Sequence, residues 1–141
     1  MSDTLSSRER SMRMSLIRSR DTKPEVLVRR LLHSLGYRYR LHRRDLPGTP
    51  DLVFPSRRAV LFVHGCFWHR HADCKLARLP KSRLDFWVPK LQANKERDAR
   101  KIEELRAAGW RVGVVWECQL ADREALTRRL RAFLDGDGEL P

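Results

Sequence analysis

The run HGCFWHRHADC at positions 64–74 carries three histidines, two cysteines and an aromatic pair. Within it, Cys66, His71 and Cys74 follow a C-x4-H-x2-C spacing, which is short enough to wrap around one metal ion. Cys118, the remaining cysteine, could complete a tetrahedron of three thiolates and one imidazole. Such a site has no open position, so it would be structural rather than catalytic. Buried free thiols are the alternative interpretation of these cysteines.

A carboxylate and an imidazole are expected at one end of the central sheet. Asp51 follows a Pro-Gly-Thr-Pro turn and begins an apolar strand, and the next apolar strand runs directly into His64. A tight turn at residues 55–58 would make these strands antiparallel neighbours, which places Asp51 and His64 at the same end. Together they could hold a metal ion and provide a base, although an aspartate in a turn is also common without any function.

Three more polar residues are candidates for the same site. Asp98 shares one face of an expected helix with apolar residues, so its charge needs a partner, either a surface arginine or a site histidine that it orients. His69 lies inside the metal-held loop but outside the ligand set, which would place it rigidly. Glu25 follows Thr22 at capping-box spacing, and this spacing alone favours a structural role over a catalytic one.

Aromatic residues surround the same run. Phe67 and Trp68 are adjacent on a loop held at Cys66, so both cannot easily bury in one core pocket. One interpretation is that one of them packs and the other covers the metal site. The other is a rigid aromatic wedge, joined by Trp87 from the long helix, that could enter a stack of bases.

Length and charge set the class of partner. The chain has 141 residues, which suits one domain with one hydrophobic core, and its 30 Lys and Arg exceed 18 Asp and Glu to give a formal net charge of +12. This excess indicates a polyanionic partner, most simply nucleic acid, although a solvated basic surface is the alternative. Since no segment reaches the roughly 20 apolar residues of a membrane span or resembles a signal peptide, we expect a cytoplasmic protein without a membrane partner.

The elements that must position these residues follow from the apolar periodicity. A helix begins at the Thr22 cap and ends at Gly36. After it we expect strands at 37–41, 51–54, 59–63 and 110–116, and helices at 85–108 and after an Asp122 cap. Uninterrupted apolar runs in the second and third strands indicate a sheet covered on both faces.

The expected fold class is therefore α/β, a mixed central sheet flanked by helices in the order α-β-β-β-α-β-α. Residues 1–20 contain five arginines and are expected to form a basic arm that orders on a partner. The folded domain is expected at 21–134, with a tail at 135–141.

Five segments, in order along nearly the whole chain, carry a more specific signal. They are RDTKPE (20–25), LPGTPD (46–51), FVHGCFWHRH (62–71), NKERD (94–98) and VWEC (115–118). Together they resemble the very-short-patch repair (Vsr) DNA mismatch endonucleases, a zinc-containing branch of the restriction-endonuclease-like nucleases. Members of that family nick DNA 5′ of the thymine in T·G mispairs left by deamination of 5-methylcytosine. The resemblance implies a restriction-endonuclease-like core with a structural zinc site.

The resemblance also implies roles for the polar residues. Asp51 would ligate a catalytic Mg²⁺ together with the main-chain carbonyl of Val63, and Glu25 would touch metal-bound water. His69 would be the general base or acid, oriented by Asp98.

Further roles follow from the same resemblance. His64 would assist near the scissile phosphate. The zinc ligands would be Cys66, His71, Cys74 and Cys118. The residues that pry the duplex open beside the mispair would be Phe67, Trp68, Trp87 and Met14. At 62–64, Phe-Val-His stands where the wider superfamily has an acid and a lysine two residues apart, which leaves general base work to histidine and the number of Mg²⁺ ions open.

The implied partner is double-stranded DNA with a T·G mismatch, bound by a nucleoid-associated monomer in the cytoplasm. A zinc-stabilised DNA-binding protein without catalysis is one alternative. A related nuclease that cuts matched DNA is the other.

Overall fold

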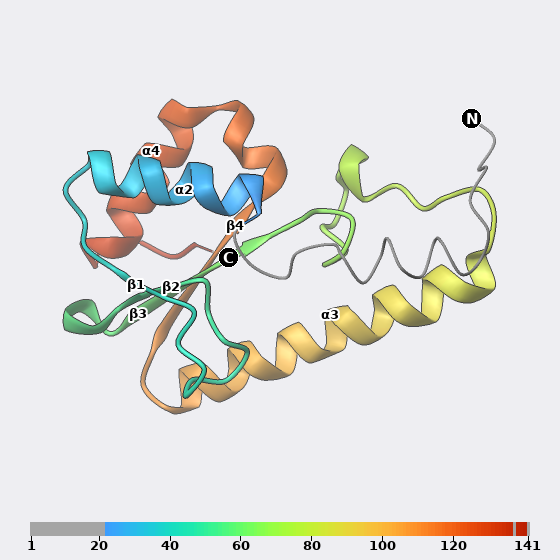
Figure 1. Cartoon of the computed structure of the whole chain (residues 1–141), viewed down its shortest axis with the longest axis horizontal. Helices are drawn as coiled ribbons and strands as arrows, with labels where there is room; N and C mark the ends of the chain where they lie inside the picture. Colours follow the sequence, from blue (N-terminus) through green and yellow to red (C-terminus); the bar gives the residue numbers. More distant parts are fainter. Residues whose placement is uncertain (1–21, 137, 141) are drawn as a thin grey trace.

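The computed structural model describes residues 22–136 and 138–140, and these form three layers (Figure 1). The elements are α2 (Lys23–Ser34), β1 (Arg40–Leu41), β2 (Leu52–Phe54), η1 (Pro55–Arg57), β3 (Ala59–His64), η2 (Lys75–Ala77), α3 (Leu84–Ala107), β4 (Arg111–Trp116), η3 (Glu117–Ala121) and α4 (Arg123–Leu134). Helices α2 and α4 cover one face of the sheet, and α3 covers the other. The expected arm at 1–20, including Met14, lies outside the described residues.

The sheet has the strand order β1-β2-β3-β4. β2 pairs antiparallel with β1 and β3, whereas β3 and β4 are parallel, so the expected mixed sheet is confirmed. Leu52 pairs with Leu61, which places Asp51, one residue before β2, beside the end of β3 that carries His64. The expected placement of Asp51 and His64 at one end of the sheet is therefore confirmed.

Apolar side chains bury both faces of the sheet, as the uninterrupted apolar runs predict. The layer under α2 and α4 includes Val28, Leu32, Leu52, Leu61, Leu126, Leu130 and Phe133. The layer under α3 includes Val53, Val60, Phe62, Leu105, Val112 and Val114. Because successive residues of a strand point to opposite faces, β3 contributes alternately to the two layers.

The first strand is shorter than expected: only Arg40 and Leu41 pair with β2, not the whole of 37–41. Tyr37 is instead buried in the core, and its hydroxyl donates to Asp135 at 3.1 Å. The strand ends at Leu41, because the positive φ of 47° at the next residue, His42, turns the backbone out of the extended conformation.

The chain beyond α4 returns to the sheet. Leu140 is 1% exposed and packs among the residues under α2 and α4, and its carbonyl accepts from the Val114 N–H at 2.9 Å. Part of the segment expected as a tail is therefore packed on the core.

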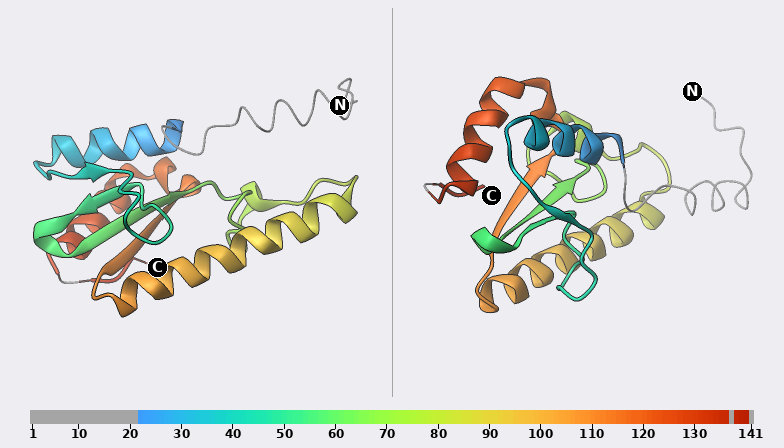
Figure 2. Two further views of the ribbon diagram at one scale, coloured as in Figure 1. Left: turned by 60° about the horizontal axis from the view of Figure 1, so that its bottom comes forward. Right: turned by 60° about the vertical axis from the view of Figure 1, so that its left-hand side comes forward.

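The helix signals are confirmed where they bear on the site. Thr22 caps α2 in a reciprocal capping box with Glu25, and the side chain of Asp122 caps α4 by accepting from the Ala125 N–H. α3 has 24 residues, of which only Leu91 and Leu105 are buried, because its first half extends past the sheet (Figure 2).

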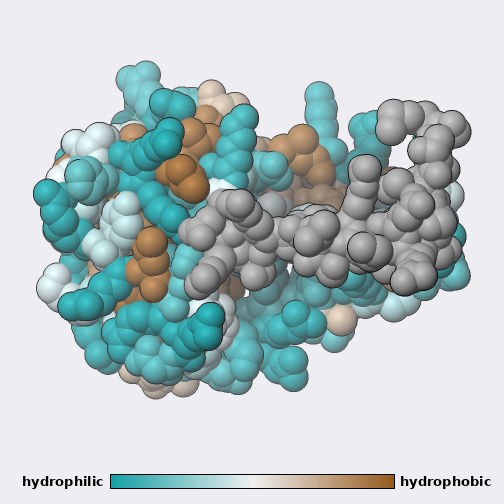
Figure 3. Space-filling view, in the orientation of Figure 1, coloured by the Kyte–Doolittle hydropathy of each residue, from teal (hydrophilic) through white to brown (hydrophobic). Residues whose placement is uncertain are grey.

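Hydrophilic residues cover most of the face seen in Figure 3, as expected from the high charge. Among the described residues, no helix is long and apolar enough to cross a membrane.

Candidate active site and metal cluster

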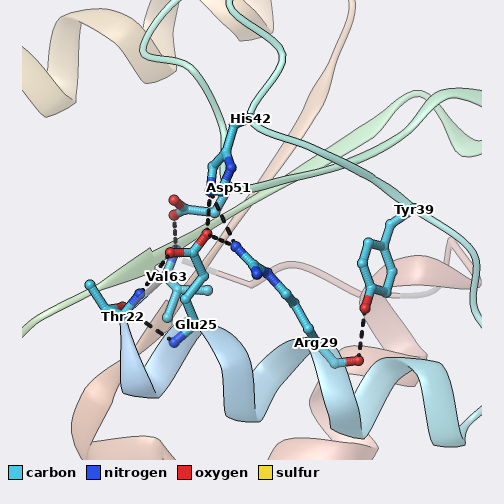
Figure 4. A network of polar contacts seen from close by, with 7 residues as sticks. All are labelled: Thr22, Glu25, Arg29, Tyr39, His42, Asp51 and Val63. Atoms are coloured by element: carbon cyan, nitrogen blue, oxygen red, sulfur yellow. Dashed lines mark hydrogen bonds and ion pairs between the residues drawn. The ribbon is translucent and has the colours of Figure 1, made fainter. Parts of the chain in front are cut away.

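Asp51 lies at the end of the β2–β3 hairpin with a fixed carboxylate (Figure 4). Its Oδ2 accepts from the Val63 N–H at 2.7 Å. Burial, with a smaller contribution from the charge of nearby Glu25, raises the pKa of Asp51 to about 7 against the opposing effect of the Val63 N–H. A buried carboxylate without a neighbouring positive charge is costly to ionise. A divalent cation bound beside Asp51 would stabilise its charged form, so this side chain is suited to be a metal ligand.

His69 and Asp98 form a second polar group. His69 Nδ1 contacts Asp98 Oδ2, so the proton of the neutral imidazole lies on Nδ1 and Nε2 is left to accept one. We expected either a site histidine or a surface arginine as the partner of Asp98, and the structure places the histidine, His69, beside it.

His64 stacks on this pair. The rings of His64 and His69 are parallel within 6°, with centroids 3.9 Å apart. Burial, with a smaller contribution from neighbouring His69, lowers the pKa of His64 to about 3, so His64 stays neutral at physiological pH. Of the two stacked imidazoles, His64 is therefore not suited to gain a proton.

Both groups open into one cleft of about 860 Å³ between the sheet end, the start of α2 and the middle of α3. Asp51 and Glu25 line this cleft together with His69 and Asp98. The positively charged side chains on its wall are Arg44, Lys90, Arg97 and Lys101. A cleft with carboxylates, an oriented imidazole and a basic rim suits hydrolysis of a phosphodiester.

The four residues of the expected metal cluster converge. One donor atom from each of Cys66, His71, Cys74 and Cys118 lies within 4.8 Å of the others. His71 Nδ1 is 3.6 Å from the Cys66 sulfur and 3.4 Å from the Cys118 sulfur. Three sulfurs and one imidazole fit a tetrahedral Zn²⁺ site, so this donor set could hold the ion that the spacing predicts.

The aromatic residues gather beside the cleft. Phe67, Trp68 and Trp87 contact one another edge-to-face, with ring centroids 5.2, 5.4 and 5.9 Å apart. All three side chains are half-buried, so neither Phe67 nor Trp68 is fully packed into the hydrophobic core. This geometry favours the aromatic cluster over the interpretation in which one ring packs and the other covers the metal site.

Comparison with known proteins decides the family. The profile described as "DNA mismatch endonuclease Vsr" matches residues 2–76. Over 135 residues the chain is 62% identical to the Type II nicking enzyme V.XorIIP of Xanthomonas oryzae pv. oryzae, with 96% of this chain and 98% of that protein covered. The chain belongs to the Vsr family of DNA mismatch endonucleases. The DNA mismatch endonuclease Vsr of Escherichia coli is 43% identical over 143 residues, covering 98% of this chain and 91% of that protein.

Membership of the Vsr family makes the chain an endonuclease, a hydrolase that acts on DNA. The catalytic domain of the homing endonuclease I-Bth0305I superposes with a TM-score of 0.57 at 18% identity, covering 83% of this chain and 98% of that domain. This likeness shows a shared fold.

Two residues of this Vsr-family site were not expected from the sequence. His42 Nε2 contacts Glu25 Oε1 close to Asp51. Trp116 stacks on His71 at 4.2 Å and 9°, and it meets the His64 ring edge-on at 5.2 Å. Trp116 thereby joins the cluster of Cys66, His71, Cys74 and Cys118 to the stacked histidines.

The raised pKa of Asp51 predicts a pH dependence of stability. Because this pKa rises from 3.8 to about 7 on folding, the folded enzyme holds a proton that the unfolded chain loses across this range. Without added Mg²⁺, the free energy of unfolding should therefore fall as the pH rises from about 4 to about 7, and then level off. Urea unfolding between pH 5 and 8 measures this slope. The variant Asp51→Asn should lose this component, and an identical slope in the variant would contradict the assignment.

Proposed function

We propose that this Vsr-family endonuclease nicks DNA 5′ of the thymine in T·G mispairs, depends on Mg²⁺, and acts in very short patch repair of deaminated 5-methylcytosine. The observation that carries the proposal is the convergence of Asp51 and the His69–Asp98 pair on one cleft beside an aromatic cluster. The names of the relatives support mismatched DNA as the substrate.

Asp51, with the Val63 carbonyl, would hold the Mg²⁺. When bound, the cation supplies charge neutralisation at the phosphate and activation of a water molecule. His69 exchanges a proton at Nε2 with the attacking water or the leaving oxygen, and Asp98 stabilises the imidazolium that forms. His64, neutral and stacked on His69, keeps that ring in place and offers a donor or acceptor near the phosphate.

Substitution of His69 tests this assignment. His69→Gln should lower the single-turnover nicking rate by roughly 100- to 10,000-fold, the usual contribution of a general acid or base. Asp98→Asn should cause a smaller loss, since an amide oxygen still accepts from Nδ1 but does not stabilise an imidazolium. His33→Gln, on the exposed face of α2, is the matched control and should nick like the wild type. A His69→Gln enzyme with full activity would overturn the role.

We propose that Phe67, Trp68 and Trp87 form the wedge that enters the duplex beside the mispair. A wobble pair is easier to disrupt than a matched pair, so insertion costs less of the few kcal/mol that each unstacked step requires. Basic residues on the cleft wall, such as Lys90 and Arg97, would hold the phosphates without reading sequence.

Trp68 provides the corresponding prediction. Trp68→Ala should lower the ratio of T·G to T·A nicking by roughly 10-fold, since a wedge contribution of about 1.4 kcal/mol corresponds to that factor. Trp68→Phe, which keeps an aromatic ring, should retain most of the discrimination. The readout is kcat/KM on paired duplexes that differ only in the mispair. Equal losses on both duplexes would argue against a wedge.

Nicking of T·G and T·A duplexes with Mg²⁺ or with EDTA tests the whole proposal. We expect a nick 5′ of the thymine only with Mg²⁺, and much faster in the T·G duplex than in the T·A duplex. Cleavage of both duplexes at similar rates would indicate a nuclease for matched DNA. Binding without cleavage under every condition would indicate a DNA-binding protein without catalysis.

A further inference from the structure

Glu25 is a buried carboxylate with two donors on one oxygen. It is only 2% exposed, although it lies in the first turn of α2 at the edge of the cleft. Its Oε1 accepts from Arg29 at 2.6 Å and also contacts His42 Nε2 (Figure 4). A buried carboxylate is stable only when it is hydrogen-bonded to cationic or N–H donors, and these two side chains supply them.

The same carboxylate lies beside the proposed metal ligand. One donor atom from each of Glu25, His42 and Asp51 lies within 4.8 Å of the others. Two carboxylates this close repel one another, and the charge of Glu25 contributes to the raised pKa of Asp51. The second oxygen of Glu25, Oε2, accepts from the Thr22 N–H at the long distance of 3.4 Å. One oxygen is thus engaged strongly and the other weakly.

The fold delivers His42 to this place through strand register. β1 pairs antiparallel with β2, with Leu41 opposite Leu52, so the next residue, His42, lies opposite Asp51. Its N–H donates to the Asp51 carbonyl at 3.4 Å. The side chain is 11% exposed, so it faces Glu25 rather than solvent.

We infer that His42 is a positioning residue of the divalent-cation site: with Arg29, it fixes Oε1 of Glu25 so that Oε2 serves the cation held by Asp51. Its Nε2–H acts as a donor and not as a ligand, because the Arg29 guanidinium lies 3.3 Å from the same nitrogen and opposes a second cation there. The inference rests on the proposed cation site at Asp51, and it adds a residue that acts through Glu25.

Mn²⁺ binding in the absence of DNA tests this inference, with free Mn²⁺ followed by electron paramagnetic resonance. The full chain with its Zn²⁺ site loaded is compared with Asp51→Asn, and the binding lost in that variant defines the Asp51 site. His42→Ala should weaken this binding by roughly 10-fold, as is usual when a partner of a metal-site residue is removed. His42→Gln carries an amide N–H at the same number of bonds from the backbone, so it should stay close to wild type. The matched control is His33→Ala, which should leave the affinity unchanged.

Nicking gives the second readout. In His42→Ala, kcat should fall about as much as the Mn²⁺ affinity, with KM for DNA unchanged, because this side chain is nearly buried. Wild-type Mn²⁺ affinity and kcat in His42→Ala would overturn the inference while leaving the proposed function intact. A loss in His42→Gln as large as in His42→Ala would also overturn it, because the imidazole itself would then be the ligand. Absence of Asp51-dependent Mn²⁺ binding in the wild type would overturn the cation site and the inference together.

Discussion

Asp51→Asn is expected to lower the nicking rate on T·G duplexes by roughly 1,000-fold, since a metal ion contributes several kcal/mol to stabilising the transition state. The loss should lie in chemistry, because Asp51 carries no positive charge toward the phosphates. The amide oxygen of asparagine can still accept from the Val63 N–H, so the hairpin end should keep its shape. Single-turnover nicking at saturating enzyme, with DNA affinity measured by fluorescence anisotropy in Ca²⁺, separates chemistry from binding.

The matched control for this experiment is Asp45→Asn. Asp45 is an exposed aspartate on the same β1–β2 connection, and it pairs only with Arg43 among the described residues. Its loss removes the same charge without touching the cleft, so nicking should be unchanged. If Asp51→Asn kept more than a tenth of the wild-type rate, another residue would have to hold the cation.

The sequence predicts the parts of the site that depend on local pattern and on one tight turn. The turn at η1 makes β2 and β3 antiparallel, and this alone brings Asp51 to the end of the sheet that carries His64. The position of Asp98 on the apolar face of α3 predicts that it needs a partner, and His69 is that partner. The first inference rests on a hairpin turn and the second on the periodicity of a helix, and both are properties of residues that are contiguous in the sequence.

His42 shows why the rest of the site could not be predicted. It stands in the run Arg-Leu-His-Arg-Arg, where its neighbours give it the character of a basic surface. Its role depends on the register of the two-residue strand β1, in which Leu41 pairs with Leu52, and the alternation along 37–41 does not specify that register. Strand pairing is the signal that could have found it. If the pairing of β1 with β2 is continued by one residue beyond Leu41 and Leu52, His42 lies opposite Asp51.

Trp116 is a second residue whose place in the site could not be predicted, because it depends on the parallel pairing of β3 and β4. β4 ends at Trp116 in register with His64, and only this pairing places the indole between His64 and His71. The consequence is a continuous path of ring contacts from the Cys/His cluster to the proposed general base, His69. His69 lies on the loop that carries Cys66 and His71, so the cluster holds His69 both through the backbone and through packed rings.

Removal of the Zn²⁺ that we propose for the Cys66, His71, Cys74 and Cys118 cluster should therefore remove activity as well as stability. Cys118→Ala is expected to lower the Tm by roughly 10–15 °C, since several kcal/mol of metal-linked folding energy correspond to about 3–4 °C per kcal/mol in a domain of this size. Nicking should fall by at least about 100-fold, because His69 loses its fixed place. The sheet and α2 should stay folded, since their cores contain no part of the cluster. Hydrogen exchange should show new opening in residues 65–78 only, alongside loss of one bound Zn²⁺ by mass spectrometry.

Substitution of Cys74 distinguishes two roles of this side chain, a metal ligand and a free thiol. It is half-buried, so a free thiol there could be replaced with little effect, whereas a ligand could not. Cys74→Ala should therefore match Cys118→Ala in Tm, in zinc content and in activity. A strong zinc chelator should abolish nicking by the wild type. Adding Mg²⁺ alone should not restore activity, whereas adding Zn²⁺ and then Mg²⁺ should restore it. A Cys74→Ala enzyme that melts and nicks like the wild type would show that the sulfurs are not ligands and that the packed rings alone hold His69.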